Sequence, residues 1–144
     1  MKAFIETIQV ESKSRSDIID ITHQIEDAVR RSRIANGICV VQSLHTTASI
    51  IVNELEQGLL QDIKRKVSES FPRGVGWLHD RVDDNADAHL ASTFLGPSTT
   101  FVVKDGKIMR GVWQSILLIE LDGPRVRSIA VEVLGEELKP AYQP

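Results

Sequence analysis

The run Val112–Leu121 constrains the fold most, because it has strand-forming residues with apolar side chains at both odd and even positions. Successive side chains of a strand point to opposite faces. Ile116 and Leu118 therefore lie on one face of this strand. Leu117 and Ile119 lie on the other. Both faces are expected to bury apolar surface.

The same strand separates two polar residues, Gln114 and Glu120. At about 3.3 Å per residue they are roughly 20 Å apart on a straight strand. One small ligand can contact both only if different subunits contribute them, which favours a site at a subunit boundary. We interpret the neighbouring Trp113 as a core or interface anchor rather than as a stacking surface for a substrate.

The remaining pattern predicts a single α+β domain, a mainly antiparallel β-sheet sandwich with about three helices. Helical spacing of apolar residues predicts one helix between a cap at Ser16 and a stop at Gly37, and others over Asn53–Phe71 and Asp84–Leu95. Strands are predicted at Phe4–Val10, Ile38–Leu44, Thr100–Val103, Lys107–Gly111, Val112–Leu121 and Val126–Leu134. The tail Glu136–Pro144 is expected to fray.

Composition limits the function classes. The chain has 144 residues, 42% of them hydrophobic, which suits one domain with a core. Its net charge of -3 is spread along the sequence, so a nucleic-acid partner is not indicated. No apolar run approaches the roughly 20 residues that span a bilayer, and the start lacks a secretion signal. The lone Cys39 resembles a buried hydrophobe, and a cytoplasmic location is expected.

Three of the four histidines, His45, His79 and His89, fall in or just before polar segments. Histidine exchanges protons near neutral pH and ligates metals. We expect the three to converge on one divalent metal, Zn²⁺ or Mg²⁺, or on one bound anion in its absence. Asp84 is a candidate helix cap, and Asn85 shares a helix face with His89 four residues later.

Several common sites are excluded. The acidic run that begins at Asp83 starts like an EF-hand, but Ala88 stands where glycine is needed and Phe94 where a bidentate glutamate is needed. Gly74 and Gly76 lack the third glycine and the preceding strand of a dinucleotide loop. No Gly-x-Ser-x-Gly elbow exists and the single cysteine lies in an apolar strand, so a covalent hydrolase is not predicted.

The chain resembles the YjbQ family, also called UPF0047, in the order and spacing of six segments. These are His45–Ser49, Asn53–Glu54, His79–Asp80, Asp83–Leu90, Gly111–Gln114 and Glu120–Arg125. The resemblance implies a compact α+β domain that forms homotrimers, with a polar cleft near a subunit boundary. It also implies a secondary thiamine-phosphate synthase activity, which joins a pyrimidine diphosphate to a thiazole phosphate and releases diphosphate.

Residues and resemblance together predict a site for a small phosphorylated substrate. The expected catalytic residues are His45, His79, Asp84 and His89. The expected substrate-binding residues are Thr46, Thr47, Asn53, Glu54, Asn85, Gln114, Glu120 and Arg125. His45 could instead cap a turn, and Arg125 could be an ordinary surface charge rather than a phosphate-binding fork. The alternative functions are a metal-dependent hydrolase of a phosphorylated or acylated metabolite and a non-catalytic metabolite-binding trimer.

Overall fold

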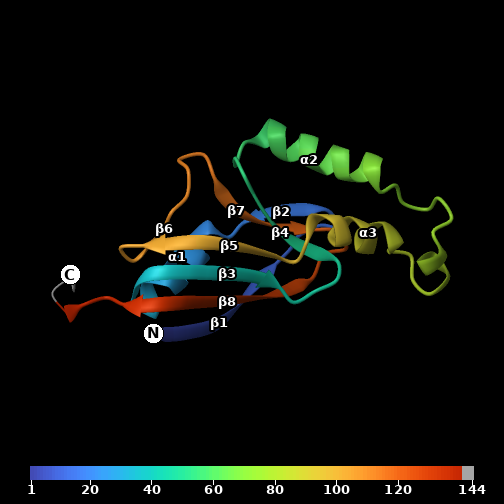
Figure 1. The fold of residues 1–144 in the computed structure, drawn as a ribbon. Helices are drawn as coiled ribbons and strands as arrows, with labels where there is room; N and C mark the ends of the chain where they lie inside the picture. Colours follow the sequence, from blue (N-terminus) through green and yellow to red (C-terminus); the bar gives the residue numbers. More distant parts are fainter. Residues whose placement is uncertain (141–144) are drawn as a thin grey trace.

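The computed structural model describes residues 1–140 and has the predicted α+β architecture (Figure 1). Its larger sheet has the strand order β1 (Lys2–Glu11), β8 (Val126–Glu137), β3 (Ile34–Ser43), β5 (Ser98–Lys104) and β6 (Lys107–Ile108). Its smaller sheet has the order β2 (Asp17–Asp20), β7 (Ser115–Glu120) and β4 (Ala48–Asn53). All strand pairs are antiparallel. The helices are α1 (Thr22–Ser32), α2 (Gln57–Ser70), the 3-10 helix η1 (Leu78–Arg81) and α3 (Ala86–Leu95).

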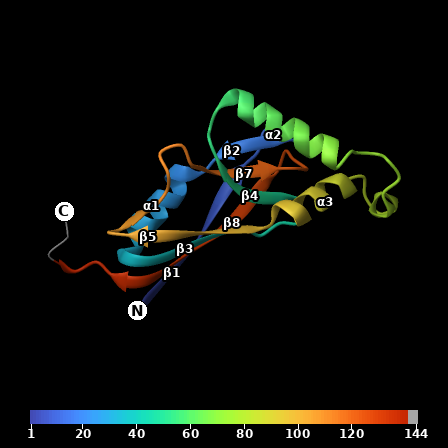
Figure 2. The same cartoon turned by 45° about the horizontal axis from the view of Figure 1, so that its top comes forward.

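The smaller sheet is a middle layer of the fold. The prediction that β7 buries apolar side chains on both faces is therefore confirmed. Figures 1 and 2 show it between the five-stranded sheet and α2. Ile116 and Leu118 belong to the main core, which also contains residues of α1 and of the larger sheet. Ile119 belongs to a second core, packed with residues of α2 and α3. Each such fully buried side chain stabilises the fold by about 1.5–3 kcal/mol.

The first predicted helix, from Ser16 to Gly37, was too long at both ends. Ile18 pairs with β7 as part of β2, so the chain is still extended there. The helix begins at Thr22, whose backbone N–H donates to the Asp20 carboxylate at 3.0 Å. It ends at a left-handed residue, Arg33, and Gly37 lies inside β3.

The other boundaries shifted for similar reasons. The segment before α2 forms strand β4, which was not predicted, and α2 is capped by the Glu56 carboxylate, which accepts from the backbone N–H groups of two following residues. Asp84 does not cap α3. The Asp80 carboxylate accepts from the Ala86 N–H at 3.0 Å instead. At the other end of the chain, Glu136 and Glu137 belong to β8 rather than to a frayed tail, and residues 141–144 lie outside the described part.

Two further expectations concern single features. Cys39 is fully buried, as predicted, and burial raises the pKa of its thiol to about 12. Such a thiol is neutral at physiological pH and a poor nucleophile. None of the helices within residues 1–140 is both long and apolar enough to cross a membrane.

Candidate functional site

Glu120 forms a buried ion pair with Arg127 across the turn between β7 and β8. Its side chain is 0% exposed. The Arg127 guanidinium donates from Nε to Glu120 Oε1 at 2.8 Å, and from Nη2 to Oε2. The Ser12 hydroxyl and two backbone N–H groups also donate to this carboxylate. Glu120, expected to bind substrate, therefore lies in the core with both oxygens occupied.

Thr47 belongs to the same network and is also structural. Its hydroxyl and its carbonyl oxygen accept from Arg127 Nη2 at 2.9 and 3.2 Å. Thr46, by contrast, is exposed. Sequence reasoning missed Arg127, although a signal was available: strand alternation places Arg127 on the inward face with Ile129 and Val131. An inward-facing arginine requires a buried carboxylate.

Acid is expected to weaken the fold through Glu120. Burial would by itself raise its pKa, but hydrogen bonds from Arg127, Ser12 and the Asp122 N–H outweigh burial and lower the pKa below the ordinary value. Stability from this lowered pKa is present above the unfolded-state pKa of about 4.3 and is lost as the pH falls through the folded-state value. The free energy of urea unfolding of the wild type should therefore fall below about pH 4. For Glu120→Gln, this free energy should depend less steeply on pH. Equal slopes for the two proteins would contradict this.

His45 leaves the end of β3 and attaches to β8. Its Nε2 accepts a hydrogen bond from the Ser128 backbone N–H at 2.7 Å. An accepting Nε2 carries no proton, so the ring is neutral with its proton on Nδ1. Burial lowers the pKa of His45, and the nearby charges of Arg127 and Arg125 lower it further, against the opposing effect of Glu120.

In this conformation of the loop, the hydrogen bond prevents His45 from ligating a metal. Nε2 is already used, and Nδ1 holds the ring proton that a metal would have to displace. His45 thus fixes the turn after β3, and no described residue accepts a hydrogen bond from its Nδ1–H. The alternative that it caps a turn fits this geometry.

NMR can test the His45 assignment. We expect the ring to stay in the Nδ1-protonated form down to a pH below its ordinary pKa of about 6.5, because protonating Nε2 breaks the bond to Ser128 and adds a charge beside two arginines. Nitrogen-15 shifts of the imidazole, followed during a pH titration, report both tautomer and pKa. The exposed His23 on α1 is the matched reference. A His45 pKa equal to or above that of His23 would refute the assignment.

The β7–β8 turn also meets the start of α3. Asn85 is buried, its Nδ2 donates to Asp122 Oδ2 at 2.8 Å, and its Oδ1 has no partner within the described residues. Arg15 binds Asp87 through two hydrogen bonds of 3.2 and 3.1 Å. Arg125 donates to the Asp122 carbonyl at 2.8 Å and to its carboxylate at 3.3 Å, so part of its exposed guanidinium remains open.

His79 and His89 meet edge to face where η1 contacts α3. Their ring centroids are 4.6 Å apart, although one comes from η1 and the other from α3. Asp84, also expected to be catalytic, is exposed close by in sequence and accepts from Arg73 at 3.0 Å. Two of the three predicted histidines are thus brought together. Within residues 1–140 of one chain, however, no three histidine, cysteine or acidic residues form a group able to hold a metal.

A second group of candidates lies away from the histidine pair. Asn53, Glu54, Trp113 and Gln114 line a pocket of about 270 Å³ with Val52. Gln114 also closes its own loop, because its Oε1 accepts from the Gly111 N–H at 2.7 Å. Trp113 is 73% exposed, so it is not a core anchor in the single chain. Figure 1 shows the loop from β6 to β7 far from η1 and the start of α3.

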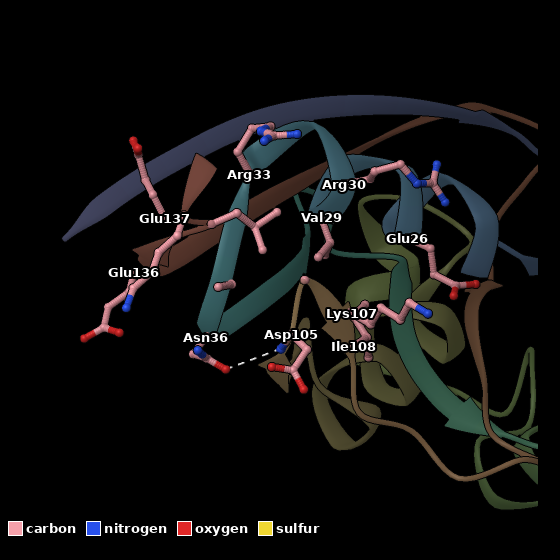
Figure 3. A pocket seen from close by; sticks show the side chains of 14 residues that line it. Glu26, Val29, Arg30, Arg33, Asn36, Asp105, Lys107, Ile108, Glu136 and Glu137 are labelled. Carbon is pink, nitrogen blue, oxygen red and sulfur yellow. Dashed lines mark hydrogen bonds between the residues drawn. The ribbon is translucent and has the colours of Figure 1, made fainter. Parts of the chain in front are cut away.

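A larger cavity belongs to neither group. It has a volume of about 780 Å³ and lies between the end of α1, the β5–β6 hairpin and the end of β8 (Figure 3). Its lining includes cations such as Arg33 and Lys107 and anions such as Asp105 and Glu136. None of the predicted site residues lines it.

Comparison with known proteins assigns the family. The model of the family described as UPF0047 protein YjbQ-like matches residues 6–136. A UPF0047 protein of Archaeoglobus fulgidus is 45% identical over 127 residues, which cover 88% of this chain and 98% of the relative. The UPF0047 protein YugU of Bacillus subtilis is 31% identical, with 91% and 99% of the two chains covered.

Solved structures agree. A crystal structure of a YbjQ-like protein of unknown function from Sulfolobus solfataricus P2 is similar, with a TM-score of 0.92 and 47% identity, over 94% of this chain and 99% of that one. A hypothetical protein from Aeropyrum pernix K1 has a TM-score of 0.90 and 38% identity, with 92% and 99% covered. The segments that carry the sequence resemblance lie within the matched range. This chain belongs to the UPF0047 (YjbQ-like) family.

Proposed function

We propose that this chain is one subunit of a trimeric enzyme for a small phosphorylated substrate, with its site completed where two subunits meet. One observation carries the proposal: candidate residues gather in two separated regions, the histidine pair and the small pocket, which we call the two ends of the subunit, and each end exposes apolar side chains. Val82, beside the histidine pair, is 84% exposed, and Val112, beside the small pocket, is 88% exposed. Clustered exposed apolar residues mark surfaces that another chain covers.

In a closed ring of subunits, each subunit uses each of its two ends in one contact. A contact between one end of a subunit and the other end of its neighbour is heterologous, and three such contacts can close into a trimer. The pair His79 and His89 of one subunit would then lie against the pocket formed by Asn53, Glu54 and Gln114 of the next. This arrangement removes the difficulty that the two groups are too far apart within one chain.

The chemistry suits a phosphorylated substrate. Histidines such as His79 and His89 are common general acids and bases, and the open part of the Arg125 guanidinium can neutralise a phosphate. The two imidazoles are also close enough to share one divalent ion, Zn²⁺ or Mg²⁺, if the neighbouring subunit supplies the other ligands. The reaction we propose joins a pyrimidine diphosphate to a thiazole phosphate with release of diphosphate.

Subunit complementation tests the shared site. We expect His89→Ala and Gln114→Ala to abolish diphosphate release separately while the melting temperature changes little, because Gln114 is exposed and His89 is only partly buried. After subunit exchange between the two variants, about a quarter of the interfaces contain two intact ends, so activity should return to roughly that fraction. His23→Ala, which changes an exposed histidine on α1, should behave as wild type.

Each failure has a distinct meaning. A stable monomer in sedimentation at micromolar concentration contradicts the trimer. Stable mixed trimers without recovered activity contradict the shared site. If His89→Ala loses about 1–3 kcal/mol of unfolding free energy, seen as a lowered melting temperature, and the folded fraction stays active, His89 is structural. Absence of turnover in wild type, despite binding of the thiazole phosphate, favours the non-catalytic binding trimer.

A further inference from the structure

The cavity between the end of α1, the β5–β6 hairpin and the end of β8 has the size of a small-molecule site. Its volume of about 780 Å³ lies within the range of about 300–1,000 Å³ that ligand pockets occupy. None of the residues assigned to the proposed function lines it. The side chains that do line it indicate which class of ligand fits.

Apolar side chains from three segments meet in this cavity. Val29 of α1 is a member of the main core, and Ile108 of β6 packs against that core. Leu138, just past the end of β8, is half-buried, and its side chain lies 3.7 Å from where a Cβ atom would stand at Gly106. Its backbone N–H donates to the Arg33 carbonyl oxygen at 2.7 Å, which fixes this segment beside α1. The cavity thus offers an apolar surface to the body of a ligand.

Arg33 adds a charge that no carboxylate of the described chain neutralises. It is half-buried, it lines the cavity, and it forms no ion pair within residues 1–140. Its backbone is left-handed, with a φ of 60°, at the C-cap of α1. Glycine adopts that conformation most readily, so the end of the helix does not by itself account for an arginine here. A guanidinium presents a planar fork of donors that matches carboxylate and phosphate oxygens.

The other charges of the lining leave room for an anion. Lys107 also lacks an ion pair among the described residues, and Figure 3 shows Arg33 and Lys107 on opposite sides of Val29. In the same view the unpaired carboxylates of Asp105 and Glu136 point away from Val29. The C-terminus of α1 carries only about half a negative elementary charge, less than these two cations supply. The remaining carboxylates of the lining are paired, Glu26 with Arg110 and Glu137 with Lys2.

We infer that this cavity binds a small amphipathic anion, a molecule with an apolar body and one carboxylate or phosphate group. The apolar body lies on Val29, Ile108 and Leu138, and the anionic group accepts hydrogen bonds from Arg33. Lys107 contributes a second positive charge. The inference does not rest on the proposed function, because the two sites share no residue.

Calorimetric titration of the whole chain with four eight-carbon probes tests the ligand class. Octanoate and octyl phosphate carry the anionic group, and octanol and octylammonium are their neutral and cationic counterparts. At least one of the two anions should bind about tenfold or more tightly than octanol, because a hydrogen bond to a charged group strengthens binding by that much. Octylammonium should bind more weakly than octanol. The tighter anion shows whether the site prefers a carboxylate or a phosphate.

Variants of the lining locate the binding. Arg33→Gly removes the guanidinium and suits the left-handed backbone, so it should weaken binding of the tighter anion about tenfold while the melting temperature changes little. Leu138→Ala should weaken binding of that anion and of octanol alike, because both probes use the apolar surface. Arg65→Ala, which removes an exposed arginine of α2, should bind the probes as wild type does.

Three results would overturn the inference. Octanol that binds as tightly as both anions shows that the cavity does not recognise the charge. Unchanged affinity for the anions in Arg33→Gly places their binding elsewhere. Absence of heat of binding for both anions at millimolar concentration shows that the cavity takes no such ligand. None of these results affects the complementation of His89→Ala by Gln114→Ala, which tests the shared site separately.

Discussion

Glu120→Ala is expected to lower the free energy of unfolding by about 3–5 kcal/mol, because it leaves Arg127 buried and charged without its carboxylate. The Arg127 side chain is only 3% exposed, so water cannot replace the lost partner. Ser12 and two backbone N–H groups also lose their acceptor. Urea unfolding monitored by circular dichroism measures the loss.

An exposed ion pair supplies the control. Arg65 and Glu69 bind each other on the surface of α2 at 2.8 Å. Glu69→Ala should cost less than about 1 kcal/mol, since both groups remain hydrated. A comparable loss in the two variants would mean that Arg127 gains water or another partner when Glu120 is removed, and would contradict a buried structural pair.

Gly37→Ala is expected to lower the free energy of unfolding by about 4 kcal/mol or more, which leaves little folded protein. A Cβ atom at this position would lie 1.9 Å from the Leu134 carbonyl oxygen and 2.8 Å from the Gly135 Cα. Both are backbone atoms of β8, the central partner of β3, so no side-chain rotation relieves the overlap. The two strands would have to separate or shift register.

Gly111→Ala is the matched control. A Cβ atom added at Gly111 would have the Gln114 side chain as its nearest neighbour, at 3.5 Å, which is an ordinary contact distance. The free energy of unfolding of Gly111→Ala, measured by thermal melts, should differ from that of the wild type by no more than about 0.5 kcal/mol. A Gly37→Ala protein that melts near wild type would show that β3 and β8 tolerate a wider spacing.

The fold was predictable where local patterns were unambiguous. Apolar residues at odd and even positions of Val112–Leu121 predicted a strand buried on both faces; the strand is shorter, Ser115–Glu120, but both cores confirm its two buried faces. The last helix was placed within two residues of α3. Errors occurred where a neighbour in space decided the conformation. Ile18 continues a helical spacing in the sequence, yet pairing with Ile119 makes it part of a strand.

The candidate site was predictable only as a set of residue types. The sequence alone determined that histidines, carboxylates and amides gather in a few segments, and it predicted that Gln114 and Glu120 lie too far apart to share one ligand within a chain. Tertiary structure decided their roles: it buried Glu120 with Arg127, tied His45 to Ser128, and paired His79 with His89. These contacts join residues up to 83 positions apart, as His45 and Ser128 are. Burial and hydrogen-bond partners depend on such long-range contacts, whereas periodicity reports only what lies within a few residues along the chain.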